Sequence, residues 1–256
     1  MTSLLQMRDV RLVYGRRRPT LALEGLDLAI DEGAFVAVVG PSGCGKSSLM
    51  KLVTGLRRPS AGSVADKPVV GPLNIVGMAF QNSSLLPWRT ILQNVMLPLE
   101  IVEPHRQRLR RERARYRQQA NALLALVGLE NFGEKYPWQL SGGMQQRASL
   151  CRALIHEPAL LMLDEPFGAL DAFTREDLWD VLQALYLQKR PTVILVTHDL
   201  REAAFLADTI YVFSPRPGRI VWRETIDLPR PRTLDMTYHT EFVDLVHRLR
   251  GQIVRG

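Results

Sequence analysis

The sequence predicts an α/β fold organised around one glycine-rich loop. Short apolar runs rich in β-branched residues alternate with longer amphipathic segments, which is typical of buried strands and helices in alternation. Near the N-terminus, 4–13 and 21–30 alternate imperfectly between apolar and polar residues, which predicts two antiparallel strands joined by an arginine-rich turn. The run 34–39 then leads into the loop Gly40–Ser48, and a helix-forming segment follows as far as Gly55. A strand, a glycine loop and a helix in this order predict an anion site at the start of the helix.

The loop has the spacing of a phosphate-binding loop, and its residues are Gly40, Pro41, Ser42, Gly43, Cys44, Gly45, Lys46, Ser47 and Ser48. Glycines let successive backbone N–H groups turn toward one anion. We expect Lys46 to reach the β- and γ-phosphates and the Ser47 hydroxyl to hold Mg²⁺. The alternative is a chance glycine-rich turn. Strand, lysine and serine in register favour a site for a nucleoside triphosphate.

Composition sets wide limits. The 256 residues suffice for one large domain or two small ones, and 46% hydrophobic with 23% charged residues is ordinary for a globular protein. No apolar run approaches the length of about 18 residues that a membrane span needs, and the N-terminal residues 1–9 do not resemble a secretion signal. Two cysteines, Cys44 and Cys151, do not form a disulfide framework. These features predict a cytoplasmic protein.

Much of the net charge of +7 is local, because residues 105–117 include seven arginines among thirteen residues. Such a run is typical of a solvated helix face, and the alternative is contact with a membrane surface or an acidic partner. Only Tyr116 is aromatic in this stretch, so base stacking is not indicated and nucleic acid is not expected as a partner.

The remaining chain continues the alternation. Residues 56–70 predict loops and short edge strands, and buried strands are expected at 75–80, 159–163, 192–196 and 209–213. Helices are expected at 91–128, 141–156, 174–188 and 200–207, and a last helix has apolar positions on one face at Phe242, Leu245, Val246, Leu249 and Ile253.

Three residues mark where these helices begin or end. Thr90 and Ser141 are suited to cap the helices that follow them, and Gly128 is suited to end the first one. The apolar stripe of that first helix is expected at Ala122, Leu123, Leu126 and Val127.

Five further motifs follow the phosphate loop in order: Gln81, Leu140–Arg147, Leu160–Pro166, Gly168–Asp171 and His198. With that loop they resemble, over nearly the whole chain, the ATP-binding subunit of an ABC transporter. The resemblance implies a P-loop NTPase (RecA-like) core with an antiparallel β subdomain and an inserted α-helical subdomain. It implies one nucleotide-binding domain at 1–235, with the helical part at about 84–157, and a C-terminal helix at 236–256 packed on the same domain.

The resemblance also implies catalytic roles. Asp164 would coordinate Mg²⁺, and Glu165 would be the general base, or alternatively a second carboxylate near the metal. His198 would hold the γ-phosphate and the attacking water, although a histidine at a strand tip is otherwise structural. Gln81 would contact Mg²⁺ and the water, beside Lys46 in the phosphate loop.

Other implied contacts concern the nucleotide. Tyr14 matches an adenine-stacking aromatic, although a tyrosine at a strand end is often only packing, and Asp171 belongs to a nucleotide-binding motif. Gly168 stands where many relatives carry serine. Ser141, Gly142 and Gly143 form a helix N-terminus that would face the phosphate loop of a second subunit, so that two ATP molecules lie in a head-to-tail homodimer.

Three segments, at 86–90, 167–175 and 214–220, resemble the nitrate/sulfonate/taurine class of importers. That class implies a separate membrane permease, an external solute-binding protein and a peripheral place on the cytoplasmic face of the inner membrane. Residues 81–100, with the apolar cluster Leu85–Trp88, are expected to dock on the permease, unless Trp88 only fills its own subdomain. The alternatives are an export ATPase and a soluble ABC protein of DNA repair or ribosomes, whose tandem cassettes or coiled-coil insertion this chain lacks.

Overall fold

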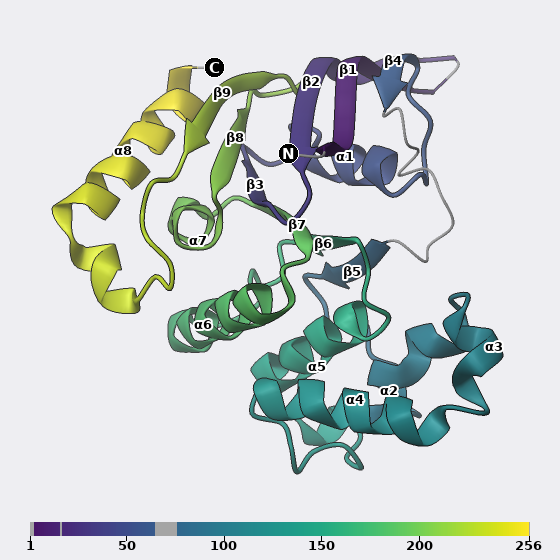
Figure 1. Ribbon diagram of the computed structural model, residues 1–256. Helices are drawn as coiled ribbons and strands as arrows, with labels where there is room; N and C mark the ends of the chain where they lie inside the picture. The colour runs from purple at the N-terminus through teal and green to yellow at the C-terminus, as the bar shows by residue number, and fades with distance from the viewer. Residues whose placement is uncertain (1–2, 16, 65–75, 256) are drawn as a thin grey trace. The chain divides into compact units, whose positions relative to one another are not determined.

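The computed structural model describes residues 3–15, 17–64 and 76–255, with no side-chain description beyond Ile253. It divides into two compact units (Figure 1). Unit 1 comprises Met1–Pro72 and Thr192–Gly256, and unit 2 comprises Leu73–Pro191. Neither unit was delimited in this way from the sequence, and the domain boundaries given above remain a prediction.

The first sheet of unit 1 contains the two predicted N-terminal strands, β1 (Ser3–Tyr14) and β2 (Thr20–Asp31). They pair antiparallel from Ser3 opposite Asp31 to Tyr14 opposite Thr20, which confirms the prediction. A short strand, β4 (Ala61–Val64), pairs antiparallel with the other edge of β1, as the edge-strand prediction allowed. Arg16, in the predicted turn, lies outside the described residues.

A second group of strands forms the centre of unit 1. Strand β3 (Phe35–Val39) lies between β7 (Thr192–Thr197) and β8 (Thr209–Phe213), and all three are parallel. Every residue of β3 and β7 is buried, as expected for central parallel strands. A strand that the sequence did not predict, β9 (Ile220–Thr225), pairs antiparallel with β8, and its exposed residues explain why it gave no strong apolar signal.

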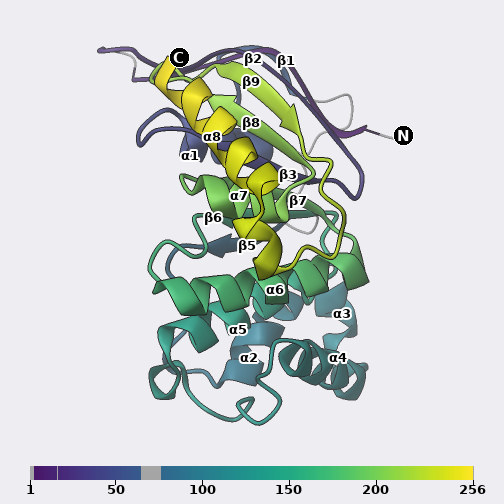
Figure 2. The ribbon, with the colours of Figure 1, turned by 90° about the vertical axis from the view of Figure 1, so that its left-hand side faces the viewer.

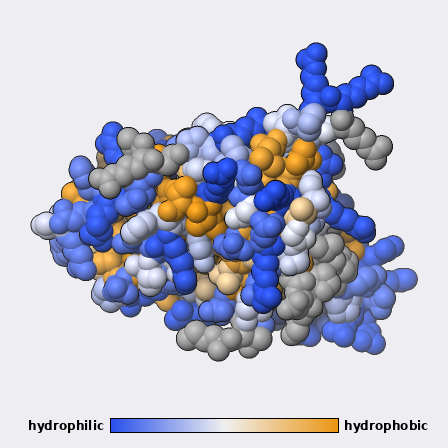
Figure 3. Space-filling model, turned by 90° about the horizontal axis from the view of Figure 1, so that it is seen from above, coloured by the Kyte–Doolittle hydropathy of each residue, from blue (hydrophilic) through white to orange (hydrophobic). Residues whose placement is uncertain are grey.

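The helices of unit 1 are α1 (Lys46–Val53), α7 (Leu200–Leu206) and α8 (Thr240–Arg255), with a 3-10 turn at Leu234–Tyr238. Helix α8 runs beside α7 (Figures 1 and 2). Its residues Phe242, Leu245 and Leu249 are buried, which agrees with the predicted apolar face. On the face seen in Figure 3, apolar groups form separate patches among polar ones.

Unit 2 contains the parallel strands β5 (Val76–Phe80) and β6 (Leu160–Asp164), both predicted, although Ile75 lies outside the described residues. Its helices are α2 (Ile91–Met96), α3 (His105–Leu109), α4 (Arg113–Leu126), α5 (Gly142–Leu154) and α6 (Ala172–Lys189), with 3-10 turns at Leu97–Glu100 and Pro137–Gln139.

The prediction of one helix over 91–128 was wrong in two respects. Pro98 and Pro104 cannot donate the backbone hydrogen bonds of a continuous helix, and the segment is divided into α2, a 3-10 turn, α3 and α4. The expected stripe was also misplaced: Leu126 is 44% exposed, whereas Leu124, outside that stripe, is 1% exposed. The buried face of α4 instead runs through Tyr116 and Ala120, which lie two turns and one turn before Leu123 and Leu124.

The predicted caps are present. Thr90 accepts a hydrogen bond from the Gln93 amide at 3.3 Å, and the Gln93 side chain accepts one from the Thr90 amide at 3.0 Å. Gly128 has φ +71° and ends α4. Among the described residues, no helix combines the length and the apolar character that crossing a bilayer requires.

Candidate functional site

The predicted site residues fall in both units, and each unit is described by itself. In unit 1, the glycine loop leaves β3 and enters α1 at Gly45, whose φ of +114° is available to few residues besides glycine. A Cβ atom on Gly45 would lie 2.8 Å from Leu23 Cδ2 and 2.9 Å from the Ala22 carbonyl oxygen. The first turn of α1 carries no acidic residue. The loop is therefore packed tightly on β2, with the positive end of α1 directed into it.

Lys46 lies inside the loop. Its side chain is 7% exposed, and Nζ donates hydrogen bonds to the Gly40 carbonyl at 2.7 Å and the Pro41 carbonyl at 3.1 Å. These two hydrogen bonds hold the Lys46 ammonium group inside the curve of the loop. An ammonium group has three N–H donors, so one remains for a further acceptor. Ser47 is exposed, and Cys44 is buried, which raises the pKa of its thiol.

A second glycine, Gly218, is distant in the sequence but packs against the loop. The Gly218 amide donates to the Ala22 carbonyl at 2.9 Å, and the Gly218 carbonyl accepts from the Glu24 amide at 3.1 Å. A Cβ atom on Gly218 would collide with the Cys44 carbonyl oxygen. In the sequence, residues 214–220 stand out only by their resemblance to the importer class. The structure shows that this turn packs directly on the phosphate loop.

Tyr14 lies at the end of β1, next to α1. Its hydroxyl donates to Ser48 Oγ at 3.2 Å, and two cations lie near its ring: Arg57 at 4.7 Å and Lys51 at 5.8 Å from the ring centroid. Both distances are within the range of cation–π attraction. Arg57, which the sequence analysis did not single out, therefore helps to fix the orientation of this ring.

His198 follows β7 directly, and Gly40 follows β3 directly. Because Val39 pairs with Thr197 in parallel register, the phosphate loop and His198 leave the sheet at the same edge of unit 1. The Thr197 hydroxyl accepts a hydrogen bond from the Asp199 amide at 3.0 Å. The Asp199 carboxylate caps α7 by accepting hydrogen bonds from the Arg201 and Glu202 amides. His198 is exposed between these two anchored residues.

In unit 2, Gln81, Asp164 and Glu165 meet at one strand edge. Phe80 pairs with Asp164 in the parallel pair β5–β6, so Gln81 and Glu165 follow neighbouring strand ends. Glu165 has φ +45°, a left-handed conformation that costs a non-glycine residue about 1 kcal/mol or more. The Gln81 amide nitrogen lies so near Gly168 that a Cβ atom there would come within 3.1 Å of it. Gly168 thus leaves room for Gln81 where a serine would crowd it.

The residues Ser141, Gly142 and Gly143 begin α5, as predicted. Ser141 Oγ accepts from the Met144 amide at 3.3 Å, and Ser141 and Gly142 are exposed. Gly143 is buried, and a Cβ atom on it would collide with Thr174 Cγ2 on α6. The exposed helix start is therefore held in place by α6.

Side-chain hydrogen bonds join α5 to the loop that carries Gln81. Gln146 Nε2 donates to the Phe80 carbonyl at 2.7 Å, and Ser83 Oγ donates to Gln145 Oε1 at 3.1 Å. Arg152 donates to the carbonyls of Ser83 at 2.7 Å and Ser84 at 2.8 Å. The start of α5 and the segment after β5 are thus mechanically connected.

Asp171 caps α6. Its two carboxylate oxygens accept from the Thr174 amide at 3.0 Å and the Thr174 hydroxyl at 2.7 Å. The backbone hydrogen bond from Thr174 lowers the pKa of Asp171 below its usual value. The carboxylate therefore has a structural role whatever else it binds.

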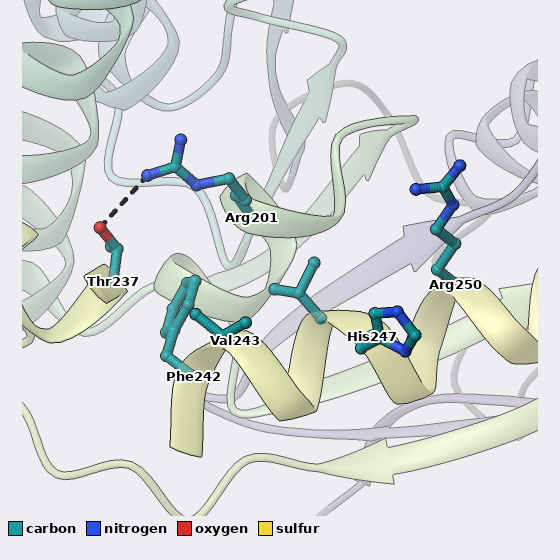
Figure 4. Close-up of a pocket in the computed structure, with 7 residues that line it drawn as sticks. Arg201, Thr237, Phe242, Val243, His247 and Arg250 are labelled. Carbon is teal, nitrogen blue, oxygen red and sulfur yellow. Dashed lines mark hydrogen bonds between the residues drawn. The ribbon is translucent and has the colours of Figure 1, made fainter. Parts of the chain in front are cut away.

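Unit 1 also contains a hollow (Figure 4). It is lined on α7 and α8 by Arg201, Phe242, Val243, His247 and Arg250, and Arg201 donates to Thr237 Oγ1 at 3.2 Å. It contains none of the predicted site residues.

The fold and the phosphate loop define a nucleotide-binding α/β protein of the P-loop class. Residues 23–168 match the family model described as ABC transporter. The chain is 42% identical over 216 residues to the aliphatic sulfonates import ATP-binding protein SsuB of Bacillus licheniformis, which covers 84% of this chain and 81% of that protein. It is 43% identical over 223 residues to the taurine import ATP-binding protein TauB of Yersinia pestis, with 86% and 85% covered.

Among solved structures, the dimeric structure of MJ0796, a bacterial ABC transporter cassette, is 30% identical with a TM-score of 0.71 and covers 88% of this chain and 100% of that chain. The chain belongs to the ABC transporter family of ATP-binding proteins. These findings confirm the predicted P-loop NTPase fold, the ATPase class and the resemblance to importer subunits.

Proposed function

We propose that this chain is the ATP-hydrolysing subunit of an ABC importer for a sulfonate, taurine, nitrate or a related small solute. The carrying observation is the identity of more than 40% with two import ATPases over more than four fifths of the chain. The six motifs named from the sequence also lie on described residues, which supports the proposal. As such a subunit, the chain acts peripherally at the cytoplasmic face of the inner membrane, with a permease and an external solute-binding protein.

In this proposal the nucleotide is bound mainly by unit 1. The loop amides and Lys46 hold the phosphates, and Tyr14 stacks on adenine. Glu165 receives the proton of the attacking water or orients that water, while His198 and Gln81 hold the γ-phosphate and the water in line. The oxygen donors Ser47, Gln81 and Asp164 suit Mg²⁺, which prefers hard ligands and would neutralise phosphate charge.

We further propose that two copies bind two ATP molecules head to tail. The solved cassette MJ0796 is described as dimeric, and Ser141 and Gly142 present an exposed helix start whose N–H groups suit an anion. Beside Asp171, the aromatic side chain of Phe173 is 83% exposed, as expected of a surface that a partner covers.

Mixing two inactive variants tests the shared site. Subunits carrying Lys46→Ala and subunits carrying Ser141→Arg are each expected to be inactive, whereas their heterodimer contains one site with neither change. Activity should return on mixing, up to about a quarter of wild type if the two sites fire independently and dimers form at random. If heterodimers form and every mixing ratio stays inactive, the shared site is contradicted.

For the permease, the proposal places docking at residues 81–100 and the adjoining groove. Trp88 is 71% exposed, which argues against a role in filling its own subdomain, and Ile101 is 59% exposed. Phe80, Leu97, Pro98 and Ile101 line an apolar groove of about 280 Å³ in unit 2. This surface adjoins the segment after β5 that Arg152 of α5 holds through hydrogen bonds to Ser83 and Ser84. A permease loop bound there would therefore move together with Gln81.

Cross-linking tests the docking. Single cysteines at Leu86, Trp88 and Arg89 are expected to cross-link to cytoplasmic loops of the permease, with yields that differ between ATP-bound and nucleotide-free states. A cysteine at Arg223, on β9 of unit 1, serves as the control position. Absence of cross-links together with normal assembly of Trp88→Ala would move the docking surface elsewhere.

A further inference from the structure

The arginine-rich segment of unit 2 is not a uniform solvated face. Three of its arginines have carboxylate partners: Arg111 lies 3.7 Å and Arg115 3.1 Å from Glu112, and Arg117 pairs with Glu134. Within the described ranges, the other four arginines form no ion pair with a carboxylate: Arg106, Arg108, Arg110 and Arg113. All four are exposed. The segment therefore contains paired arginines and a separate group whose charge is uncompensated.

Three of these four uncompensated arginines converge on one hollow, and Arg108 lies outside it. Arg106, Arg110 and Arg113 line a cavity of about 430 Å³, together with Gln93, Glu100 and Leu109. Glu100 accepts from Arg89 Nη1 at 2.7 Å, so its carboxylate is already compensated by another cation. Three guanidinium groups at one hollow repel one another unless an anion binds between them.

The hollow is held in shape by the fold. His105 Nδ1 on α3 lies 3.0 Å from the Tyr116 hydroxyl on α4, and their rings meet edge to face with centroids 5.7 Å apart. The Glu112 amide donates to the Arg108 carbonyl at 2.9 Å, which continues the turn between the two helices. The backbones that carry the three arginines are therefore fixed relative to each other.

We propose that this hollow is a binding site for a phosphate-bearing anion, distinct from the ATP site. Guanidinium groups bind phosphate oxygens in a bidentate manner, and three of them attract an anion such as a phosphomonoester, a pyrophosphate or a phospholipid headgroup. Gln93 adds an amide for hydrogen bonding, and Leu109 adds an apolar surface for the group that carries the phosphate. The volume is within the usual range for small-ligand sites, about 300–1,000 Å³.

Two triple variants of the full chain test the site. Arg106→Gln/Arg110→Gln/Arg113→Gln removes the hollow's arginines, and Arg108→Gln/Arg111→Gln/Arg115→Gln removes the same charge from the same segment outside it. Glutamine keeps the helix propensity of arginine, and circular dichroism verifies that both proteins fold. Binding is measured to vesicles of phosphatidylglycerol and phosphatidylcholine against phosphatidylcholine alone, and to pyrophosphate with the nucleotide site filled by ADP.

The hollow variant should lose at least tenfold in affinity for one probe, and the control variant less than threefold. If the hollow variant loses affinity only for the anionic vesicles, the ligand is a lipid headgroup. If it loses affinity for pyrophosphate, the ligand is a soluble phosphate compound. Equal losses in both variants, or no binding of either probe by the wild type, would overturn the proposal. These readouts do not depend on ATP hydrolysis, so they stand or fall separately from the importer assignment.

Discussion

The two units position their site residues by different means. In unit 1 the phosphate loop is fixed by main-chain packing: Gly45 lies against Ala22 and Leu23, and Gly218 lies against Cys44. In unit 2 the residues around Gln81 are held by side-chain hydrogen bonds from Gln146 and Arg152 on α5. Main-chain packing tolerates no added side chain, whereas side-chain bonds can be removed one at a time. The comparison predicts a rigid binding element in unit 1 and an adjustable one in unit 2.

In the proposed mechanism the base Glu165 belongs to unit 2, and the largest expected effect follows from its removal. Glu165→Gln in unit 2 removes the proposed base and keeps the shape of the side chain. Hydrolysis should fall by about 10²–10⁴-fold, while ATP affinity stays within about threefold of wild type. Steady-state turnover and equilibrium nucleotide binding measure the two quantities, and size-exclusion chromatography with ATP should show a trapped dimer. Wild-type turnover would remove Glu165 from the mechanism.

The matching change in unit 1 is Lys46→Ala. Removal of one buried cation at the phosphates should lower turnover by about 10²–10³-fold and, unlike Glu165→Gln, should weaken ATP binding as well. Lys135→Ala, at an exposed lysine of unit 2, is the control and should change neither quantity. If Lys46→Ala left affinity intact, the proposed role of Lys46 in binding the phosphates would be wrong.

Much of this architecture followed from the sequence, because its signals are local. The buried β-branched runs, the caps at Thr90 and Ser141 and the glycine loop each depend on near neighbours in the chain. The subdivision of 91–128 could also have been read from Pro98 and Pro104, whose missing N–H groups interrupt a helix. By contrast, the phase of α4 shows in the burial of Tyr116, Ala120 and Leu124, and this burial comes from tertiary packing that a single sequence does not reveal.

The site was less predictable where it depends on residues distant in the chain. Gly218 supports Cys44 from 174 positions away, and nothing near Gly218 in the sequence indicates a phosphate loop. Arg57 belongs to a loop that reads as an ordinary polar turn, yet its guanidinium lies over Tyr14. Both contacts arise from tertiary packing alone.

The main-chain packing of unit 1 can be tested at Gly218. Gly218→Ala introduces a methyl group that collides with the Cys44 carbonyl oxygen, so the loop must shift. Such overpacking costs about 1–3 kcal/mol, and we expect ATP affinity to fall about tenfold. Gly251→Ala is the control, because a Cβ atom there meets nothing within 4 Å. Equal, small effects of the two changes would show that the turn does not support the loop.

The side-chain bonds of unit 2 can be tested at Gln146, which is 2% exposed. Gln146→Leu keeps the approximate volume and leaves the Phe80 carbonyl without this donor, which should lower the free energy of unfolding by about 1–3 kcal/mol. Chemical denaturation measures the loss, with the exposed Gln118→Leu as control. ATP affinity should be unchanged within about twofold, because the phosphate loop belongs to unit 1. A large loss of affinity would contradict the independence of the two supports.

The smallest expected effect concerns the ring of Tyr14, which is positioned by side-chain contacts and not by the main-chain packing that fixes the phosphate loop of unit 1. Arg57 lies 4.7 Å from the ring centroid, and cation–π contacts at exposed sites contribute about 0.5–1 kcal/mol. Arg57→Gln should therefore weaken ATP binding about two- to fivefold, because the ring is less well oriented to stack on adenine. Tripolyphosphate, which has no base, should bind the variant and the wild type equally. Arg58→Gln removes the same charge one residue away and controls for long-range attraction to phosphates. If tripolyphosphate lost as much affinity as ATP, Arg57 would act on the phosphates, and the stacking role of Tyr14 would lose its support.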